Sequence, residues 1–221
     1  MGKHMFTGLI EATGKVLSVE RRTGTMRIAI EGPGIAEKLR LGDSVAVSGV
    51  CLTALDIKAP VFHADLAAET IARTSLTQLA PGSTVNLELP TPAGAPLGGH
   101  VVQGHVDATG SLVSLEPVNT SADRAMTDWW LEVAIPETIR PFIVEKGSIA
   151  IEGVSLTIAR WDGIQAGVAI LPHTYAATNL HTLGAGSPVN LEADVLMKLA
   201  VERQRATTFD LTLEYLLANG Y

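Results

Sequence analysis

Two histidines and an aspartate share the glycine-bordered stretch GGHVVQGHVDATG at residues 98–110: His100, His105 and Asp107. Imidazole exchanges protons near neutral pH and also binds metal ions, so both kinds of site deserve consideration. A spacing of five does not place two side chains on one helix face, and no third ligand lies near. We therefore interpret the stretch as the start of a strand that carries proton-transfer residues, not metal ligands. In an alternating strand through 100–106 the two imidazoles would lie on opposite faces, so they need not act as a pair.

Cys51 is the single cysteine of the sequence. A free cysteine in a strand is commonly a small buried hydrophobe, but a thiol beside a pocket can also take part in catalysis. The residue by itself leaves both interpretations open. A lone cysteine forms no internal disulfide, which is typical of a reducing compartment, and we expect a cytoplasmic protein.

Composition excludes several classes of function. The 221 residues are 47% hydrophobic and 18% charged, which is enough apolar material to bury a core in two small domains. The formal net charge is −7 and the basic residues are scattered, so we expect no nucleic-acid partner. The sequence has no apolar run long enough to span a bilayer and no signal-peptide pattern at its start, so we expect no membrane association.

The chain is an internal repeat. GLIEATGKVLSVE (8–20) aligns with GHVDATGSLVSLE (104–116) at an offset of 96 residues. Further along the offset becomes 104, where VAVSGVCLTAL (45–55) aligns with IAIEGVSLTIA (149–159), and 68–89 aligns with 172–193. A match that keeps its phase over so much of both halves indicates two copies of one domain.

Each half contains short runs that alternate polar and apolar residues and end in Gly, Pro or Asp, as half-buried strands do. Five or six such strands in roughly ninety residues, closed to protect their edges, predict a small barrel. One short helix is expected within 32–43 and another within 136–148. We predict an all-β protein of two tandem six-stranded barrels, with domains at 5–97 and 98–194 joined through the Pro- and Gly-rich stretch 90–99.

The tail differs from both copies and predicts a C-terminal helix over 195–217. Its apolar residues recur at helical spacing: Val195, Leu199, Phe209, Leu213, Leu216 and Leu217. A helix outside two closed barrels has little of its own chain to pack against. We expect it to join subunits, the alternative being that it packs across the two barrels.

Five motifs in order resemble one family. MFTG (5–8), GVCLT (49–53), GGHVVQGHVD (98–107), GVSLT (153–157) and VNLEAD (189–194) are similar to riboflavin synthases of the α-chain type, and the similarity covers nearly the whole chain. The resemblance implies a transferase that dismutates two molecules of 6,7-dimethyl-8-ribityllumazine, the last step of riboflavin biosynthesis. One molecule gives a four-carbon unit to the other, and the products are riboflavin and 5-amino-6-ribitylamino-pyrimidinedione.

The same resemblance implies the setting of this reaction. It implies Greek-key topology for each lumazine-binding barrel and no metal or redox cofactor. It also implies a homotrimer joined by the C-terminal helix, with each active site between the N-terminal barrel of one subunit and the C-terminal barrel of another. Lumazine synthase is a further partner that the family suggests.

The resemblance assigns residues to two kinds of role. Its catalytic candidates are Phe6, Ser44, Cys51, His100, His105, Ser155 and Asp194. Its candidates for substrate binding are Gly8, Leu9, Ile10, Cys51, Leu52, Thr53, Asp65, Leu66, Ala67, Ala68, Glu69, Thr70, Gly104, His105, Val106, Lys146, Ser155, Leu156, Thr157, Ala169, Ile170, Leu171, Pro172, His173 and Thr174. The segments 65–70 and 169–174 are expected to close the two pockets as strands, and the backbone of CLT and SLT to bind the polar edge of the pteridine ring.

Departures from the family pattern concern ligand geometry. The family commonly has PET in both pocket segments, whereas this chain has AAET (67–70) and LPHT (171–174), and Ser48 stands where asparagine is frequent. The main alternative is a non-catalytic lumazine- or flavin-carrying protein of the same fold. A hydrolase built from Ser, His and Asp is a further alternative, but the sequence has no nucleophile elbow.

Overall fold

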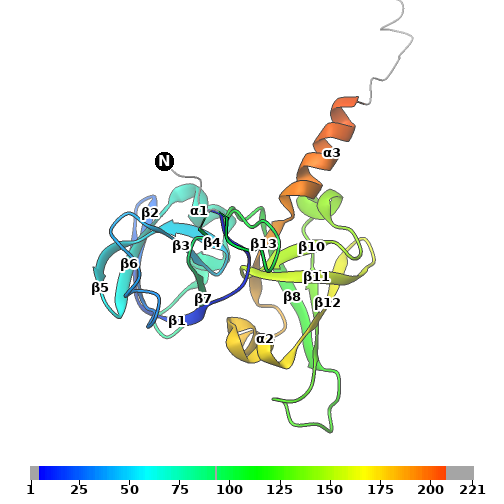
Figure 1. Cartoon of the computed structure of the whole chain (residues 1–221), viewed down its shortest axis with the longest axis horizontal. Coiled ribbons are helices and arrows are strands. Elements are labelled where there is room, and N and C mark those ends of the chain that lie inside the picture. Colours follow the sequence, from blue (N-terminus) through cyan, green and yellow to red (C-terminus); the bar gives the residue numbers. More distant parts are fainter. Residues whose placement is uncertain (1–4, 93, 208–221) are drawn as a thin grey trace, which may run out of the picture.

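A computed structural model describes residues 5–92 and 94–207 and places two barrels side by side, with a helix projecting from the second (Figure 1). Strands are the main regular elements of both halves, and the helices within the barrels are short. No helix in these residues is long and apolar enough to cross a membrane. The all-β class predicted from the repeat is confirmed.

The second half is a closed six-stranded barrel. Its strands are β8 (Ala108–Pro117), β9 (Trp129–Ala134), β10 (Ser148–Ile151), β11 (Val154–Trp161), β12 (Gln165–Ile170) and β13 (Pro188–Ala193). They pair antiparallel in the order β10-β11-β12-β9-β8-β13. Three hairpin-connected strands lie beside β9, which reaches β10 by a long connection, so the Greek-key topology is confirmed.

The first half has the same order but seven strands. They are β1 (Ala12–Arg22), β2 (Thr25–Glu31), β3 (Ser44–Val47), β4 (Val50–Thr53), β5 (Leu55–Lys58), β6 (Val61–Ala67) and β7 (Thr84–Glu88), in the order β4-β3-β7-β1-β2-β6-β5. The extra strand arises because the counterpart of β11 is divided at Ala54. Ala54 makes the same backbone hydrogen bonds, to Asp43 and Gly42, as its counterpart Ile158 makes in the undivided β11. The first half differs at Asp56, which has a φ of 41°.

Each barrel has its own apolar core, because alternate side chains of every strand point inward. In β9 the pattern of burial alternates strictly, with Trp129, Leu131 and Val133 inside. Large aliphatic side chains from the other strands fill the rest, and a separate small cluster lies between the barrels. The two domains therefore fold around separate cores and meet at a thin apolar contact.

The short helices only partly match the expectation. A 3-10 helix, η2 (Glu137–Phe142), lies within 136–148, but 33–38 forms turns and no helix. Each last hairpin strand is instead followed by a helical pair: α1 (Ala68–Arg73) with η1 (Ser75–Gln78), and α2 (Pro172–Ala177) with η3 (Asn179–Thr182). The prediction that 65–70 and 169–174 are strands throughout was wrong, since each segment turns into a helix halfway. Pro172 at the start of α2 favours this turn.

The contact between the barrels has approximate two-fold symmetry that follows the repeat. Phe6 and its counterpart Val102 exchange two backbone hydrogen bonds, of 2.8 and 3.1 Å. The backbones of Gly49 and Gly153 approach so closely that a Cβ on Gly49 would lie 2.7 Å from the Gly153 nitrogen. Only glycine fits at such a contact. Because Gly49 and Gly153 are counterparts in the repeat, the two barrels pack through equivalent surfaces.

Polar side chains complete this contact. Asn86 Nδ2 donates to the Glu152 carbonyl, and its counterpart Asn190 Nδ2 donates to the Ser48 carbonyl, both at 2.9 Å. Because Asn86 and Asn190 are buried, losing either partner would leave an unsatisfied polar group. These equivalent bonds fix how one barrel sits on the other.

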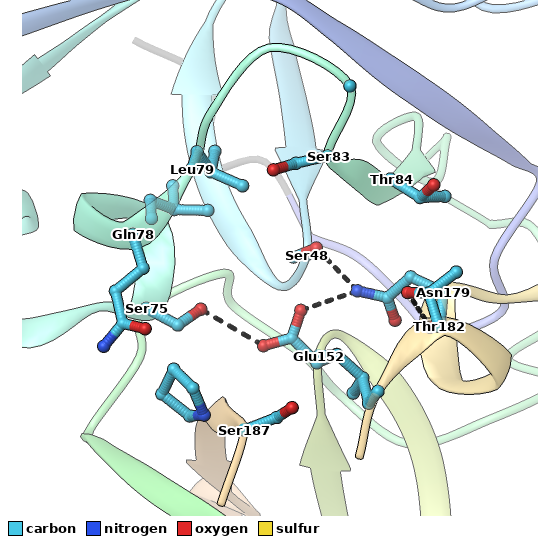
Figure 2. Close-up of a pocket in the computed structure, with 14 residues that line it drawn as sticks. Ser48, Ser75, Gln78, Leu79, Ser83, Thr84, Glu152, Asn179, Thr182 and Ser187 are labelled. Carbon is cyan, nitrogen blue, oxygen red and sulfur yellow. Dashed lines mark hydrogen bonds between the residues drawn. The ribbon is translucent and has the colours of Figure 1, made fainter.

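Figure 2 shows where the two-fold symmetry fails. A cavity of about 380 Å³ lies between the barrels, with Glu152 on one side of the approximate axis and Ser48 on the other. The Glu152 carboxyl group accepts from Ser75 Oγ at 3.3 Å, Asn179 Nδ2 at 2.9 Å and the Asn190 backbone at 2.7 Å (Figure 2 shows the first two). Burial raises its pKa. Glu152 is therefore part of the network that holds the barrels together.

The C-terminal helix α3 (Val195–Thr207) projects away from both barrels (Figure 1). Its base is held by Lys198, whose Nζ lies 2.9 Å from an Asp107 oxygen, and Asp107 also accepts from the Ala193 backbone. Leu196 and Leu199 are 63% and 57% exposed. The expected continuation to 217, with Phe209, Leu213, Leu216 and Leu217, lies outside the described residues.

Candidate active site

Two pockets occupy matching places in the two barrels. The first-barrel pocket, of about 190 Å³, is lined by Val50, Cys51, Glu69, Thr70, Arg73, Thr74, Gly104, His105 and Val106. The second-barrel pocket, of about 240 Å³, is lined by Gly8, Leu9, Ile10, Val154, Ser155, His173, Thr174, Ala177 and Thr178. Every residue of one pocket is the repeat counterpart of a residue in the other, so one chain contains two sites of the same construction.

Each pocket takes part of its wall from the opposite half of the chain. We call residues 6–10 and 102–106 the crossing segments. The Cys51 N–H donates to the Gly104 carbonyl at 2.9 Å, and the Ser155 N–H donates to the Gly8 carbonyl at 2.8 Å. A crossing segment thus acts as a short partner for the strand that carries each central side chain.

Glycine is required where the crossing segments pass these strands. A Cβ on Gly104 would lie 2.6 Å from Cys51 Cβ, and a Cβ on Gly8 would lie 2.7 Å from Ser155 Cβ. Both glycines also have positive φ, of 75° and 73°. The expectation of a strand through 100–106 was wrong: the segment is irregular, with one bridge at Val102, and the strand begins at Ala108.

Two buried glutamates hold the crossing segments in place. Glu88 accepts from the backbone of Thr7 at 2.6 Å and Gly8 at 3.1 Å. Its counterpart Glu192 accepts from the backbone of Gln103 at 2.7 Å, of Gly104 at 3.0 Å and of His105 at 3.1 Å. Sequence reasoning missed both anchors, although the identical VNLE of the two copies contains them.

Burial raises the pKa of both anchoring carboxyl groups, and raises that of Glu192 to about 7. The backbone N–H donors of residues 103 and 104 and the Lys198 charge oppose the rise without cancelling it. Near neutral pH the Glu192 carboxyl group therefore binds a proton more readily in the folded protein than in an unfolded chain.

The two histidines serve different barrels. His105 lines the first-barrel pocket with Cys51. His100 Nδ1 lies 2.7 Å from Ser155 Oγ, beside the second-barrel pocket. Burial lowers the pKa of His100 and the nearby Asp194 charge opposes this, so the neutral imidazole is favoured and can accept a proton from the serine hydroxyl. Its Nε2 is buried, and no described residue hydrogen-bonds to it.

Cys51 is paired with another candidate. Its side chain hydrogen-bonds to Ser44, a buried residue on the neighbouring strand, and this bond lowers the pKa of the thiol. Burial raises the same pKa by more, so the thiol is favoured over the thiolate. Ser44 and Cys51 thus form a polar pair in the first barrel, as His100 and Ser155 do in the second.

Other catalytic candidates have structural contacts. Phe6 is fully buried in the small cluster between the barrels, against which Cys51 packs, and it has no polar group to offer. Asp194 Oδ1 accepts from the Leu196 N–H at 2.9 Å at the start of α3, while its charge acts on His100. Phe6 therefore packs near the first-barrel pocket through Cys51, and Asp194 lies close enough to influence His100 beside the second-barrel pocket.

The predicted binding residues divide into three groups. The twelve that line the pockets come from the crossing segments, from the starts of α1 and α2, and from the positions of Cys51 and Ser155. Four have their side chains in the barrel cores: Leu52, Leu66, Leu156 and Ile170. The remainder lie outside both pocket linings: Thr53, Asp65, Ala67, Ala68, Lys146, Thr157, Ala169, Leu171 and Pro172.

Two of this last group have other partners in the structure. Lys146 Nζ lies 3.5 Å from the Ala159 carbonyl, and Asp65 forms an ion pair with Arg27. Sequence reasoning also missed lining residues on the last turns of α1 and α2, Arg73 and Ala177. Their helices were not expected, so no pattern placed them at a pocket.

The family described as the lumazine binding domain matches twice, over residues 7–90 and 103–194. The riboflavin synthase of Mycobacterium tuberculosis H37Rv is 41% identical over 205 residues, covering 90% of this chain and 97% of that protein. That of Actinobacillus pleuropneumoniae is 39% identical over 194 residues, covering 88% and 87%. That of Bacillus subtilis 168 is 35% identical over 222 residues, covering 98% and 100%.

Among solved structures, two complexes of the protein LumP are similar in fold. Its complex with 6,7-dimethyl-8-(1'-D-ribityl) lumazine has a TM-score of 0.75, and its complex with riboflavin has a TM-score of 0.78. Both share 26% sequence identity with this chain and cover 86% of it and 99% of LumP. The likeness therefore spans both barrels.

We predict that Gly104→Ala destabilises the protein more than Gly24→Ala does. Both glycines have a φ of 75°, so both variants incur about 1–2 kcal/mol of backbone strain. Only Gly104 faces a neighbour, since an added Cβ at Gly24 meets nothing within 4 Å. Overpacking should add about 1–3 kcal/mol at Gly104, measured as the free energy of unfolding in urea. Equal losses would show that the crossing segment can move away freely.

We also predict that Glu192 makes stability depend on pH. Below the ordinary carboxyl pKa both folded and unfolded chains are protonated, and above it only the folded chain retains the proton. The stability of the wild type relative to Glu192→Gln should therefore fall by up to about 3 kcal/mol as the pH rises through the carboxyl range to 7, and then level off.

Denaturation at a series of pH values measures this difference, with Glu116→Gln, at an exposed position on β8, as the control. A difference that stays constant or grows with pH would contradict the raised pKa of Glu192.

Proposed function

This chain belongs to the riboflavin synthase family, whose lumazine-binding domain it contains twice, and we propose that it catalyses the dismutation of 6,7-dimethyl-8-ribityllumazine. It is an enzyme, and the proposed class is transferase. One lumazine gives its four-carbon unit to the second, which becomes riboflavin, and the first leaves as 5-amino-6-ribitylamino-pyrimidinedione. The two products contain all atoms of the two substrates, so the overall reaction needs no oxidant or reductant.

The observation that carries the proposal is the pair of matching pockets. A reaction between two identical molecules requires two similar sites, and this chain has one in each barrel. Holding both reactants in a near-attack arrangement can supply about 7–11 kcal/mol of the barrier. The donor and the acceptor undergo different chemistry, so the pockets also have to differ at their centres, where Cys51 stands opposite Ser155 in the repeat.

The polar pairs suggest how protons move. The reaction needs a proton removed from the 7-methyl group of one lumazine and a nucleophile at C7 of the other. The neutral His100 imidazole is placed to take the Ser155 proton, which makes the serine oxygen a nucleophile or lets it relay the proton. Cys51, held as a thiol beside Ser44 and near His105, is placed to donate a proton in the other pocket.

The proposed assembly is a homotrimer formed through α3. Leu196 and Leu199 project into solvent from a helix that leaves the barrels, which favours a partner chain over packing within the chain. In such an assembly the first-barrel pocket of one subunit faces the second-barrel pocket of another. Lumazine synthase, which would supply the substrate, is a further proposed partner, and the cytoplasm is the proposed location.

A carrier function like that suggested by the LumP complexes is the alternative. The matched riboflavin synthases are more similar in sequence, at 35–41% against 26%, which favours catalysis. Cys51, His100, His105 and Ser155 are all present around the pockets in positions where proton transfer is feasible.

We predict that the purified protein converts 6,7-dimethyl-8-ribityllumazine alone into riboflavin, with one riboflavin per two lumazines and no loss of rate in chelator. Absorbance and fluorescence of riboflavin follow the reaction. Removing the hydroxyl in Ser155→Ala should lower kcat by about 10²–10³-fold, in the range expected for a lost proton-transfer group. Ser18→Ala, an exposed serine on β1, is the control.

Tight binding of the lumazine without riboflavin formation would overturn the enzyme and leave the carrier. If the protein neither binds nor converts the lumazine, both the enzyme and the carrier function are overturned. A normal rate in Ser155→Ala would remove the serine from the mechanism while leaving the reaction itself established.

We further predict that Leu196→Glu with Leu199→Glu reduces the assembly to single chains, because charges on α3 oppose apolar contact between helices. Light scattering should give three times the chain mass of 23.2 kDa for the wild type and one chain mass for the variant. Glu202→Gln, on the same helix, is the control. A wild-type mass of one chain would contradict the trimer.

A further inference from the structure

The two halves differ sharply at one place outside the pockets described above. In the second barrel the Trp129 and Tyr175 rings stack, with centroids 3.8 Å apart and planes 10° from parallel. The His181 ring lies edge-on to the Tyr175 ring, with the two ring centroids 6.2 Å apart. These three residues join the start of β9 to α2 and η3 and fill the space between them.

The counterparts of these rings in the first barrel are not aromatic. β2 pairs with β6 in the same register as β9 with β12, which makes Met26 equivalent to Trp129, and the repeat makes Ile71 equivalent to Tyr175 and Thr77 to His181. A cavity of about 250 Å³ lies here, lined by all three first-barrel residues. Met26 itself is 2% exposed and forms the floor, while Ile71 is half-buried. The first barrel therefore has an apolar pocket where the second has aromatic rings.

The connections next to these two sites, between β8 and β9 and between β1 and β2, also differ. In the second barrel the long connection 118–128 carries Arg124, whose guanidinium carbon lies 5.6 Å from the Trp129 ring centre. In the first barrel the connection is only 23–24, and Arg21 and Arg22 line the pocket instead. The second barrel thus covers a ring with a guanidinium group from its own chain, and the first barrel offers guanidinium groups beside an open pocket.

The charge at this rim is positive. Arg21 donates to the carbonyl oxygens of Thr77 and Leu79, at 2.8 and 3.1 Å, and neutral acceptors do not cancel its charge. Arg22 forms a highly exposed ion pair with Glu20, which is a weak contact that another anion can replace. A guanidinium group both stacks on aromatic rings and binds carboxylate or phosphate in a bidentate fashion.

We propose that this pocket of the first barrel binds a small planar aromatic anion. The ring would lie against Met26 and Ile71, where Trp129 and Tyr175 place their own rings in the second barrel. The anionic group would face Arg21 and Arg22. The apolar lining excludes polyols and the arginines exclude cations, so both ends of the pocket select the same class of ligand.

The site is separate from the substrate pocket but shares a helix with it. Ala68, Ile71 and Ala72 of α1 line the proposed site, whereas Glu69, Thr70 and Arg73 of the same helix line the first-barrel pocket. A ligand bound behind α1 would therefore contact the element that forms one wall of the substrate pocket. The proposal does not depend on the reaction assigned above.

The test uses the full chain labelled with ¹³C at the methionine methyl groups, because Met26 lies at the floor of the site. Indole-3-acetate is the probe, titrated with and without excess riboflavin, which fills the substrate pockets if the proposed function holds. We expect the Met26 methyl signal, assigned with Met26→Leu, to shift in both titrations, while Met126 on the distant hairpin stays unchanged. Indole-3-ethanol, which lacks the charge, should bind about fivefold more weakly.

Three variants sharpen the result. Ile71→Tyr copies Tyr175 and should fill the pocket, so the Met26 shift disappears, whereas Ile164→Tyr adds a ring at an exposed position of the second barrel and should leave it unchanged. Arg22→Ala, at the exposed rim of the pocket, should weaken the binding of indole-3-acetate by about fivefold and leave the binding of indole-3-ethanol unchanged.

The proposal is overturned if Met26 does not respond to the probe, or if Ile71→Tyr responds like the wild type. A Met26 signal that shifts with protein concentration and is insensitive to the probe would also overturn it, since a second copy of the chain would then occupy the pocket. Failure of the protein to convert 6,7-dimethyl-8-ribityllumazine into riboflavin would bear on the proposed function alone.

Discussion

The structure depends on two backbone hydrogen bonds, each of which joins one barrel to the crossing segment that comes from the other half of the chain. Gly104 accepts from Cys51 and Gly8 accepts from Ser155, and each bond sits at the centre of a pocket. Both glycines are needed for the approach, and Glu88 and Glu192 hold the backbone that brings them there. Neither pocket can therefore be understood within the barrel to which most of its residues belong.

Duplication explains why the two sites resemble each other, and local divergence explains how they can differ. The scaffold is kept by residues in equivalent places, such as Asn86 and Asn190. The differences fall at the centres, where Cys51 replaces Ser155, on the axis, where Ser48 replaces Glu152, and behind the first helix, where Ile71 replaces Tyr175. One barrel thus serves as an internal reference for the other, because the strand order is the same in both and the side chains at equivalent positions can be compared directly.

The sequence was sufficient for the fold, whereas the proposed site residues came from a family resemblance and only part of them line the two pockets. Period-two patterns predicted the strands, and the repeat predicted two equivalent barrels. The division at Ala54 was not predicted, and hydrogen bonding does not explain it, because Ile158 makes the same backbone bonds in the undivided β11. The helices after β6 and β12 were missed since AETIAR and PHTYAA have no buried face to set a helical period. In the sequence, Glu88 and Glu192 are identical residues at equivalent positions of the repeat and nothing more. Their burial depends on contacts with distant parts of the chain.

The crossing segments also set the order in which the protein can become functional during synthesis. The strands of the first barrel end at Glu88, so they leave the ribosome before Gly104 and His105 do. Until those residues arrive, the first pocket lacks a wall and the Cys51 N–H has no partner in the chain. The second pocket, in turn, waits for Ser155 to meet a segment made at the very beginning. A ligand of the first pocket can therefore stabilise the chain by mass action only after residues 104–106 have been made. A ligand of the second pocket can do so only after the second barrel has formed.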